Sequence, residues 1–144
     1  MAVCVAICGS MSFVDEMVAI ATSLKSLGYE VFTPDLEEQD YDWSNLKDPE
    51  LIKVKRAYID RHLENIRHSD VVLIANFPKR GIIGYVGPNT LMEAAFAHAV
   101  GAPIIFLNDP SEQSGGIECV AISSGCLDGD VAGITKLLDD RSDA

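Results

Sequence analysis

Short apolar runs alternate along this chain with longer segments in which apolar residues recur at helical spacing. The apolar runs are typical of strands buried on both faces of a parallel sheet. They cover residues 2–8, 29–33, 70–76 and 103–107, and a shorter run at 119–122 predicts a fifth strand. The helical spacing predicts helices over residues 13–27, about 51–68, 90–100 and 130–138.

This alternation predicts one α/β domain over residues 1–144, a doubly wound, flavodoxin- or Rossmann-like parallel sheet of about five strands with helices on both faces. In such sheets ligands bind beyond the carboxyl ends of the strands, near the switch in strand order. We therefore expect a ligand among the loops 9–13, 76–93 and 107–116. The acidic segment 35–50 is predicted to be a loop or lid.

Charge and composition disfavour several classes of function. A net charge of −11 repels phosphate backbones, which disfavours nucleic acid as a partner. No apolar run is long enough to cross a membrane, and no basic segment precedes the first run, so we expect a cytoplasmic protein. The four cysteines form no C-x-x-C pair and the histidines show no metal-ligand spacing with them, so neither a metal nor another cofactor is predicted.

The most informative segment leads from Gly84 into the helix at 90–100. Its backbone N–H groups and the helix dipole favour an anion, and Gly87, Asn89 and Thr90 are the expected contacts. Glu93 is the one carboxylate of this otherwise apolar helix. Two interpretations stay open: Thr90 and Glu93 form a capping box, or Glu93 is a catalytic group.

Further candidates come from the other loops at the same edge. Gly9, Ser10 and Met11 follow the first strand and are predicted to contact a ribose or phosphate, although Ser12 is also a plausible cap for the next helix. Asn76 and Asn108 end two other strands and are predicted substrate contacts. Two interpretations of Lys79 and Arg80, beside this edge, stay open: contacts to a ligand phosphate or, as the pattern favours, solvated loop charges.

Three stretches together resemble the nucleoside 2-deoxyribosyltransferase superfamily, which includes the 2′-deoxynucleoside 5′-phosphate N-hydrolases. The likeness covers roughly residues 2–108. It rests on Ile7-Cys-Gly-Ser10, on His62-Leu-Glu-Asn-Ile-Arg-His-Ser-Asp70-Val-Val-Leu, and on Glu93-Ala-Ala-Phe-Ala-His-Ala-Val-Gly-Ala-Pro-Ile-Ile-Phe-Leu107. The most specific feature is a glutamate that opens a small-residue helix ending in Gly-x-Pro before a strand.

The resemblance implies that Glu93 attacks the anomeric carbon of a nucleoside or nucleotide as a nucleophile, giving a glycosyl-enzyme. Water or a second base then takes the sugar. It also implies that the Gly9-Ser10 loop lines the sugar or phosphate site, and that subunits assemble as homodimers or higher oligomers.

Three features depart from the superfamily pattern. His62 stands where an aspartate is usual, and its imidazole is expected to bind or protonate a leaving base. Ala6 stands where the N-hydrolases have tyrosine, and the connection from Asp70 to Glu93 is longer than usual. Two alternatives therefore stay open: a phosphoribohydrolase acting on nucleoside 5′-monophosphates, suggested by Gly87-Pro-Asn-Thr-Leu-Met-Glu93, and a non-catalytic nucleotide-binding module.

Overall fold

The computed structural model describes residues 2–142 and contains one five-stranded parallel sheet in the order β2-β1-β3-β4-β5. All four strand pairings are parallel, which confirms the predicted α/β sheet. The strands are β1 (Cys4–Cys8), β2 (Glu30–Phe32), β3 (Val71–Ile74), β4 (Ile104–Phe106) and β5 (Gly125–Cys126). The chain moves from β1 to β2 on one side, then crosses to β3 on the other. The switch in strand order therefore lies between β1 and β3.

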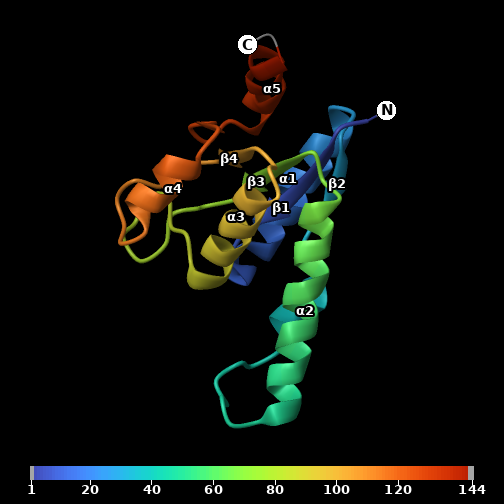
Figure 1. Ribbon diagram of the computed structural model, residues 1–144, viewed down its shortest axis with the longest axis vertical. Coiled ribbons are helices and arrows are strands. Elements are labelled where there is room, and N and C mark those ends of the chain that lie inside the picture. The colour runs from blue at the N-terminus through green and yellow to red at the C-terminus, as the bar shows by residue number, and fades with distance from the viewer. Residues whose placement is uncertain (1, 143–144) are drawn as a thin grey trace.

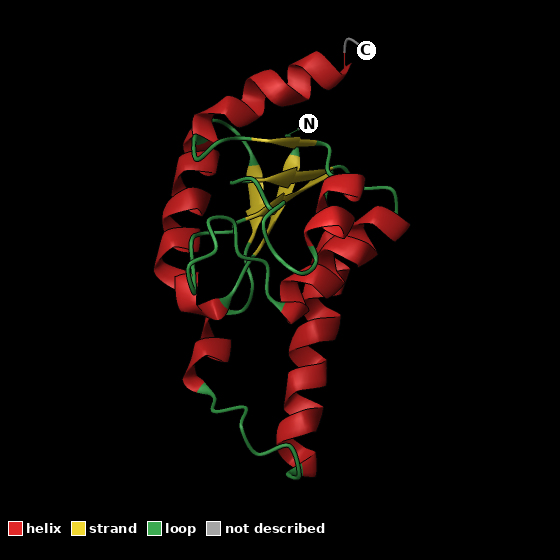
Figure 2. Cartoon of the chain, turned by 90° about the vertical axis from the view of Figure 1, so that its left-hand side faces the viewer, coloured by secondary structure: helices red, strands yellow, loops and turns green. Residues whose placement is uncertain are grey.

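Helices cover both faces of the sheet, as Figure 2 shows. They are α1 (Val14–Ser26), α2 (Pro49–Arg67), α3 (Pro88–Ala99), α4 (Gly116–Ile122) and α5 (Ile134–Ser142). Three 3₁₀ turns accompany them: η1 (Met11–Phe13), η2 (Leu36–Asp40) and η3 (Val131–Gly133). The long helix α2 extends well past the sheet, and the segment after η2 runs alongside its N-terminal half (Figure 1). No helix within residues 2–142 is both long and apolar enough to cross a membrane.

The alternation of side chains along β1 explains why the first run is almost wholly apolar. Val5 and Ile7 pack on one face with α1, whereas Ala6 and Cys8 pack on the other face against α2 and α3. Because successive strand residues point to opposite faces, a strand covered on both sides needs apolar residues at every position. All five residues of β1 are buried.

The predicted fifth strand at 119–122 is wrong. These residues belong to α4, which packs the buried Cys119 against α3 and the sheet, and the fifth strand is the short β5 that follows. A four-residue apolar run is compatible with either structure. Topology decides between them, because β5 lies parallel to β4 and a parallel pair needs a crossover, which here includes α4.

Three other boundaries differ from the prediction. The third helix begins at Pro88 rather than Thr90, because proline at the first helical position is compatible with its fixed φ. Helix α5 begins at Ile134, after η3, and runs on to Ser142. The predicted loop at 35–50 contains η2, and Asp48 caps α2 by accepting hydrogen bonds from the N–H groups of Glu50 and Leu51.

Candidate active site

The loop after β1 is held close to the sheet at the switch in strand order. A Cβ on Gly9 would lie 3.0 Å from Met17 Sδ and 3.1 Å from the Ala75 carbonyl oxygen, so a larger residue would crowd this turn. Ser10 Oγ accepts a hydrogen bond from the Ser12 N–H at 3.3 Å and caps η1. Ser12 is therefore not the cap of α1, whose first turn has no side-chain cap.

The start of α3 forms the opposite wall of the site. Gly87 is the N-cap residue, so no side chain caps the helix. Thr90 and Glu93 already lie inside the helix. The capping box between Thr90 and Glu93 is therefore wrong, since Pro88 begins the helix three residues earlier than that interpretation requires. Both side chains are buried, with 3% and 4% of their surfaces exposed. Three residues apart, they share one face of α3.

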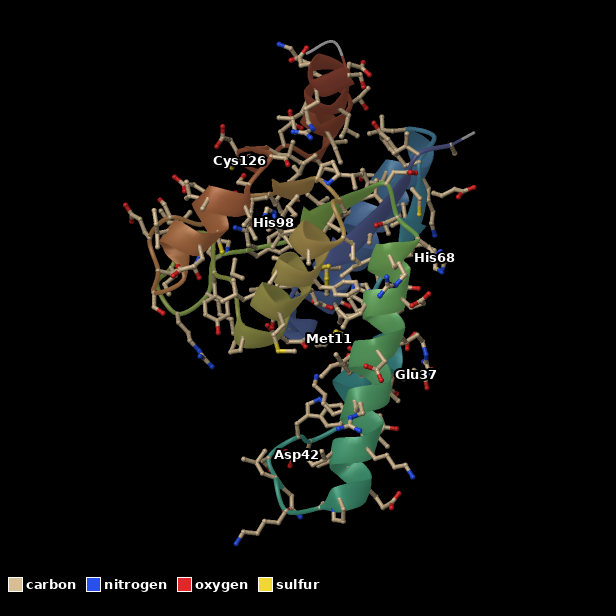
Figure 3. The ribbon with its side chains drawn as sticks, viewed as in Figure 1. Met11, Glu37, Asp42, His68, His98 and Cys126 are labelled. Atoms are coloured by element: carbon tan, nitrogen blue, oxygen red, sulfur yellow. The ribbon has the colours of Figure 1, made fainter. Side chains whose placement is uncertain are left out.

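A pocket of about 270 Å³ lies between these two walls. Helix α2 and the segment before it close a third side, and the connection after β3 closes a fourth. Met11, one of the lining residues, lies between the start of α3 and α2 (Figure 3). The lining residues are Gly9, Ser10, Met11, Glu38, Trp43, Lys55, Lys79, Tyr85, Gly87, Pro88, Asn89 and Thr90.

Glu93 does not itself line this pocket, but it lies buried one turn of α3 beyond Thr90, which does. Its Oε1 has no hydrogen-bond partner among residues 2–142. Burial raises the pKa of the Glu93 carboxyl to about 8, the Glu38 carboxylate adds to that shift, and the Lys55 ammonium opposes it. A buried carboxyl with an unsatisfied oxygen costs folding free energy, and such groups concentrate at functional sites.

His62 reaches Glu93 from α2. Its Nε2 lies 3.7 Å from Glu93 Oε2 and 2.9 Å from the Ile7 carbonyl oxygen. The Asn65 amide nitrogen lies 3.4 Å from Nδ1, which fits Nδ1 as the acceptor and Nε2–H as the donor to Ile7. Burial lowers the pKa of His62, with partial opposition from the Ile7 hydrogen bond. The neutral imidazole therefore contacts the carboxyl of Glu93.

Cys8, His62 and Glu93 are the group of side chains best placed to hold a metal ion, with ligand atoms within 4.8 Å of one another. The protonation states of these three side chains fit a hydrogen-bonded cluster better than a metal site. Burial, followed by the nearby Glu93, raises the pKa of the Cys8 thiol well above its usual value. The His62 nitrogen that faces the group is the one that donates to Ile7. A metal would have to displace both protons.

Glu38 and Lys55 also line the pocket, although no sequence pattern marks them as site residues. They form an ion pair, and Lys55 Nζ lies 4.8 Å above the ring of Trp43, which stacks on Tyr41. Glu38 is 7% exposed although it lies in an acidic run that otherwise faces solvent. No local pattern distinguishes it from its neighbours.

Asn76 and Asn108 lie at the expected edge but do not line the pocket. Asn76 Oδ1 accepts from the Asn108 N–H at 3.0 Å, and its Nδ2 donates to the Asn108 carbonyl at 2.7 Å. The Asn108 side-chain amide returns a hydrogen bond to the Asn76 carbonyl at 3.1 Å. These bonds tie together the ends of β3 and β4, and Asn76 Nδ2 also reaches the Gly84 carbonyl.

Solved structures with a similar fold are known. A 2-deoxyribosyltransferase from Bacillus psychrosaccharolyticus aligns with a TM-score of 0.62 at 13% identity, over 91% of this chain and 89% of that one. A CMP N-glycosidase from Clostridium botulinum aligns with a TM-score of 0.51 at 18% identity, over 94% and 98%. The chain has the fold of these two enzymes. No protein-family model and no curated protein matches the sequence.

Proposed function

We propose that this protein is an enzyme that cleaves or transfers the N-glycosidic bond of a nucleoside, deoxynucleoside or 5′-monophosphate, with Glu93 as nucleophile. The observation that carries the proposal is the buried Glu93 carboxyl with an unsatisfied oxygen, next to a pocket at the carboxyl edge of the sheet. The two structural neighbours, a deoxyribosyltransferase and an N-glycosidase, support the same class of chemistry.

The proposed reaction proceeds in two displacements. The Glu93 carboxylate attacks the anomeric carbon as the carbon–nitrogen bond breaks, and the bonding electron pair leaves with the base, which takes a proton from solvent. The resulting glycosyl ester is then attacked at the same carbon by water, or by a second base. The carbon–oxygen bond to Glu93 breaks, and the proton of the attacking group goes to solvent. Hydrolysis consumes one water for each free sugar and base.

In this scheme His62 acts on the carboxyl rather than on the base. Its ring contacts Glu93 and the Ile7 carbonyl, and it does not line the pocket. We therefore assign His62 as a positioning residue, which holds Glu93 in one orientation and fills the space beneath it. Protonation of the leaving base by His62, which the sequence suggests, would need a path past the carboxyl.

The substrate contacts in this proposal come from the two walls of the pocket. Gly9, Ser10 and Met11 lie on one side, and Gly87, Asn89 and Thr90 on the other. Asn76 and Asn108 support these walls through the bonds between β3 and β4. The sugar is placed over Thr90, the pocket residue that shares a helix face with Glu93.

A second copy of the chain is proposed to pack on the outer side of α3 and α4, as the resemblance implies. Large apolar side chains are exposed on these two helices and at the end of α3, and exposed apolar surface can mark a contact between proteins. They are Met92, Val100, Ile117 and Val120. Light scattering after size exclusion is expected to give a dimer or higher oligomer, and Ile117→Asp is expected to give a monomer.

Base release tests the proposal. Purified protein is incubated with nucleosides and their 5′-monophosphates, in deoxy and ribo forms, and free base is followed by chromatography. We expect base release by the wild type and at least a 1000-fold lower rate for Glu93→Gln, because the amide is a far poorer nucleophile (about 4 kcal/mol of barrier). Glu112→Gln, in an exposed loop, is the matched control.

Two results would overturn the proposal. Absence of base release from every substrate would favour a non-catalytic nucleotide-binding module. Equal rates for Glu93→Gln and the wild type would remove Glu93 as nucleophile. A preference for ribonucleoside monophosphates over every deoxy substrate would support the phosphoribohydrolase alternative, and product formation with an added second base would distinguish transfer from hydrolysis.

A further inference from the structure

Lys79 lies at the edge of the pocket on a rigid turn. Its backbone N–H donates to the Ile82 carbonyl at 3.0 Å, and the Ile82 N–H returns a hydrogen bond to the Lys79 carbonyl at 2.9 Å. Arg80 and Gly81, between them, have φ values of 54° and 76°. Two central residues with positive φ define a tight turn of type I′. The backbone of Lys79 is thus fixed before any ligand arrives.

The side chain of Lys79 is directed at the loop after β1. Its Nζ donates to Ser12 Oγ at 3.1 Å and reaches Ser10 Oγ at 3.4 Å. The same ammonium lies 5.9 Å from the ring centre of Phe13 and 5.4 Å from that of Tyr85. Two aromatic rings and two hydroxyls therefore hold the ammonium at the pocket wall.

The positive charge of Lys79 has no counter-charge in the part of the chain that the structure describes. None of its carboxylates forms an ion pair with Lys79. The other lysine of the pocket, Lys55, is paired with Glu38. In a chain with a net charge of −11, an unpaired ammonium beside a pocket favours an anionic ligand.

The N-terminus of α3 adds a partial positive charge beside the same pocket. Helix α3 has twelve residues, and no side chain caps its first turn. Pro88, Asn89 and Thr90, from that turn, line the pocket together with Ser10 and Lys79. The partial positive charge of a helix N-terminus favours a phosphate, and serine hydroxyls donate hydrogen bonds to phosphate oxygens.

We propose that Lys79, Ser10 and Ser12 form the subsite for the 5′-phosphate of the substrate, so that nucleoside 5′-monophosphates, rather than nucleosides, are the substrate class. This inference rests on the proposed function, because the phosphate belongs to the molecule whose glycosidic bond Glu93 attacks. It replaces the sequence interpretation of Lys79 as a solvated loop charge.

The kinetic test compares each nucleoside with its own 5′-monophosphate. We expect the wild type to have a kcat/KM about 100-fold higher for the monophosphate, and Lys79→Gln to lose about 10- to 100-fold on the monophosphate alone. This variant removes the charge and keeps a hydrogen-bond donor on the side chain, although glutamine is one bond shorter than lysine. Lys53→Gln, which makes the same charge change on an exposed position of α2, is the matched control.

Two kinetic results would overturn the subsite. One is a wild type that cleaves nucleosides as well as monophosphates. The other is a Lys79→Gln variant whose kcat/KM falls by the same factor on both substrates. Lys79 would then only hold the two loops together.

Calorimetric binding separates this inference from the proposed function, because it needs no turnover. Ribose 5-phosphate is expected to bind the wild type and Lys53→Gln at least 10-fold more tightly than ribose or inorganic phosphate, and Lys79→Gln is expected to lose that advantage. If this pattern appears without base release from any substrate, the subsite stands and the proposed function fails. If base is released but ribose 5-phosphate binds no better than ribose, the proposed function stands and the subsite fails. Inorganic phosphate binding as tightly as ribose 5-phosphate would also overturn the assignment to a nucleotide.

Discussion

His62 Nε2 lies 3.7 Å from Glu93 Oε2, although the two residues belong to different helices, α2 and α3. Both side chains are buried, and neither finds an opposite charge at this contact, since burial lowers the pKa of the imidazole and raises that of the carboxyl. A neutral pair at neutral pH is the consequence. The carboxyl must therefore lose its proton before it can act as a nucleophile.

The pH dependence of activity follows from the raised pKa of Glu93, which burial and the Glu38 carboxylate produce. Because the pKa of Glu93 is raised to about 8, kcat/KM is expected to rise with pH between about 6 and 9 as the carboxylate forms. Lys55→Met is expected to move the midpoint to higher pH, because the ammonium of Lys55 favours the carboxylate. Glu38→Gln is expected to move it to lower pH. A midpoint near the ordinary value of a glutamate would contradict the account.

Stability is expected to depend on pH in the opposite direction. The folded state holds the Glu93 proton up to about pH 8, whereas the unfolded chain releases it near 4.5. The contribution of Glu93 to the free energy of unfolding is thus fully present below pH 4.5 and falls as the pH rises towards 8, by an amount on the order of a few kcal/mol. Glu93→Gln removes this contribution. Urea denaturation at pH 5 and pH 9 is expected to show a smaller pH effect in the variant, and equal effects in both proteins would refute the prediction.

Substitution of His62 tests its positioning role. His62→Ala leaves the buried Ile7 carbonyl without its donor and opens space beside Glu93, so a stability loss of about 1 to 3 kcal/mol is expected. We expect kcat to fall at least 10-fold with little change in KM, because the residue does not line the pocket. His62→Gln, which can restore the donor to Ile7, is expected to recover part of both. A change in KM alone would instead place His62 in contact with substrate.

Substitution of Asn76 tests the hydrogen bonds that join the ends of β3 and β4 beside the site. Asn76→Ala removes hydrogen bonds to Asn108 and to the Gly84 carbonyl within a buried environment. The expected loss is about 2 to 4 kcal/mol in the free energy of unfolding. Asn65→Ala, which loses one long contact to His62, is the milder comparison. Equal melting temperatures for Asn76→Ala and the wild type would contradict this role.

Trp43 supplies an optical signal for binding. It is the single tryptophan of the chain, it lines the pocket, and it lies under the Lys55 ammonium. A ligand that fills the pocket changes the surroundings of its ring, so its fluorescence is expected to shift on titration with a nucleoside 5′-monophosphate. An unchanged spectrum at saturation, judged by calorimetry, would place the ligand elsewhere.

Much of the fold was predictable because strands buried on both faces leave a plain apolar signature. Residues 2–8 and 70–76 show it, and the helices between the strands follow from their spacing. The signature fails for α4, where four apolar residues fit either structure. The capping box failed for a local reason: Thr90 and Glu93 have the right spacing, but Pro88 already begins the helix.

The candidate site was predictable only where chain topology fixes it. The loops after β1 and β3 must meet at the carboxyl edge, so Ser10 and Thr90 were placed beside one pocket from sequence alone. Glu38 and Lys55 enter the pocket from the segment around η2 and from α2, and no sequence pattern shows where those elements turn. The same is true of the contact between His62 and Glu93, which depends on how α2 packs against α3.

The anomeric configuration of the product tests the central claim most directly. In a reaction run with methanol as acceptor, a β-nucleotide attacked first by Glu93 and then by methanol undergoes two inversions. Proton magnetic resonance of the product is predicted to show the β-methyl glycoside, with net retention. The α-methyl glycoside would mean a single direct displacement, and it would contradict Glu93 as the nucleophile.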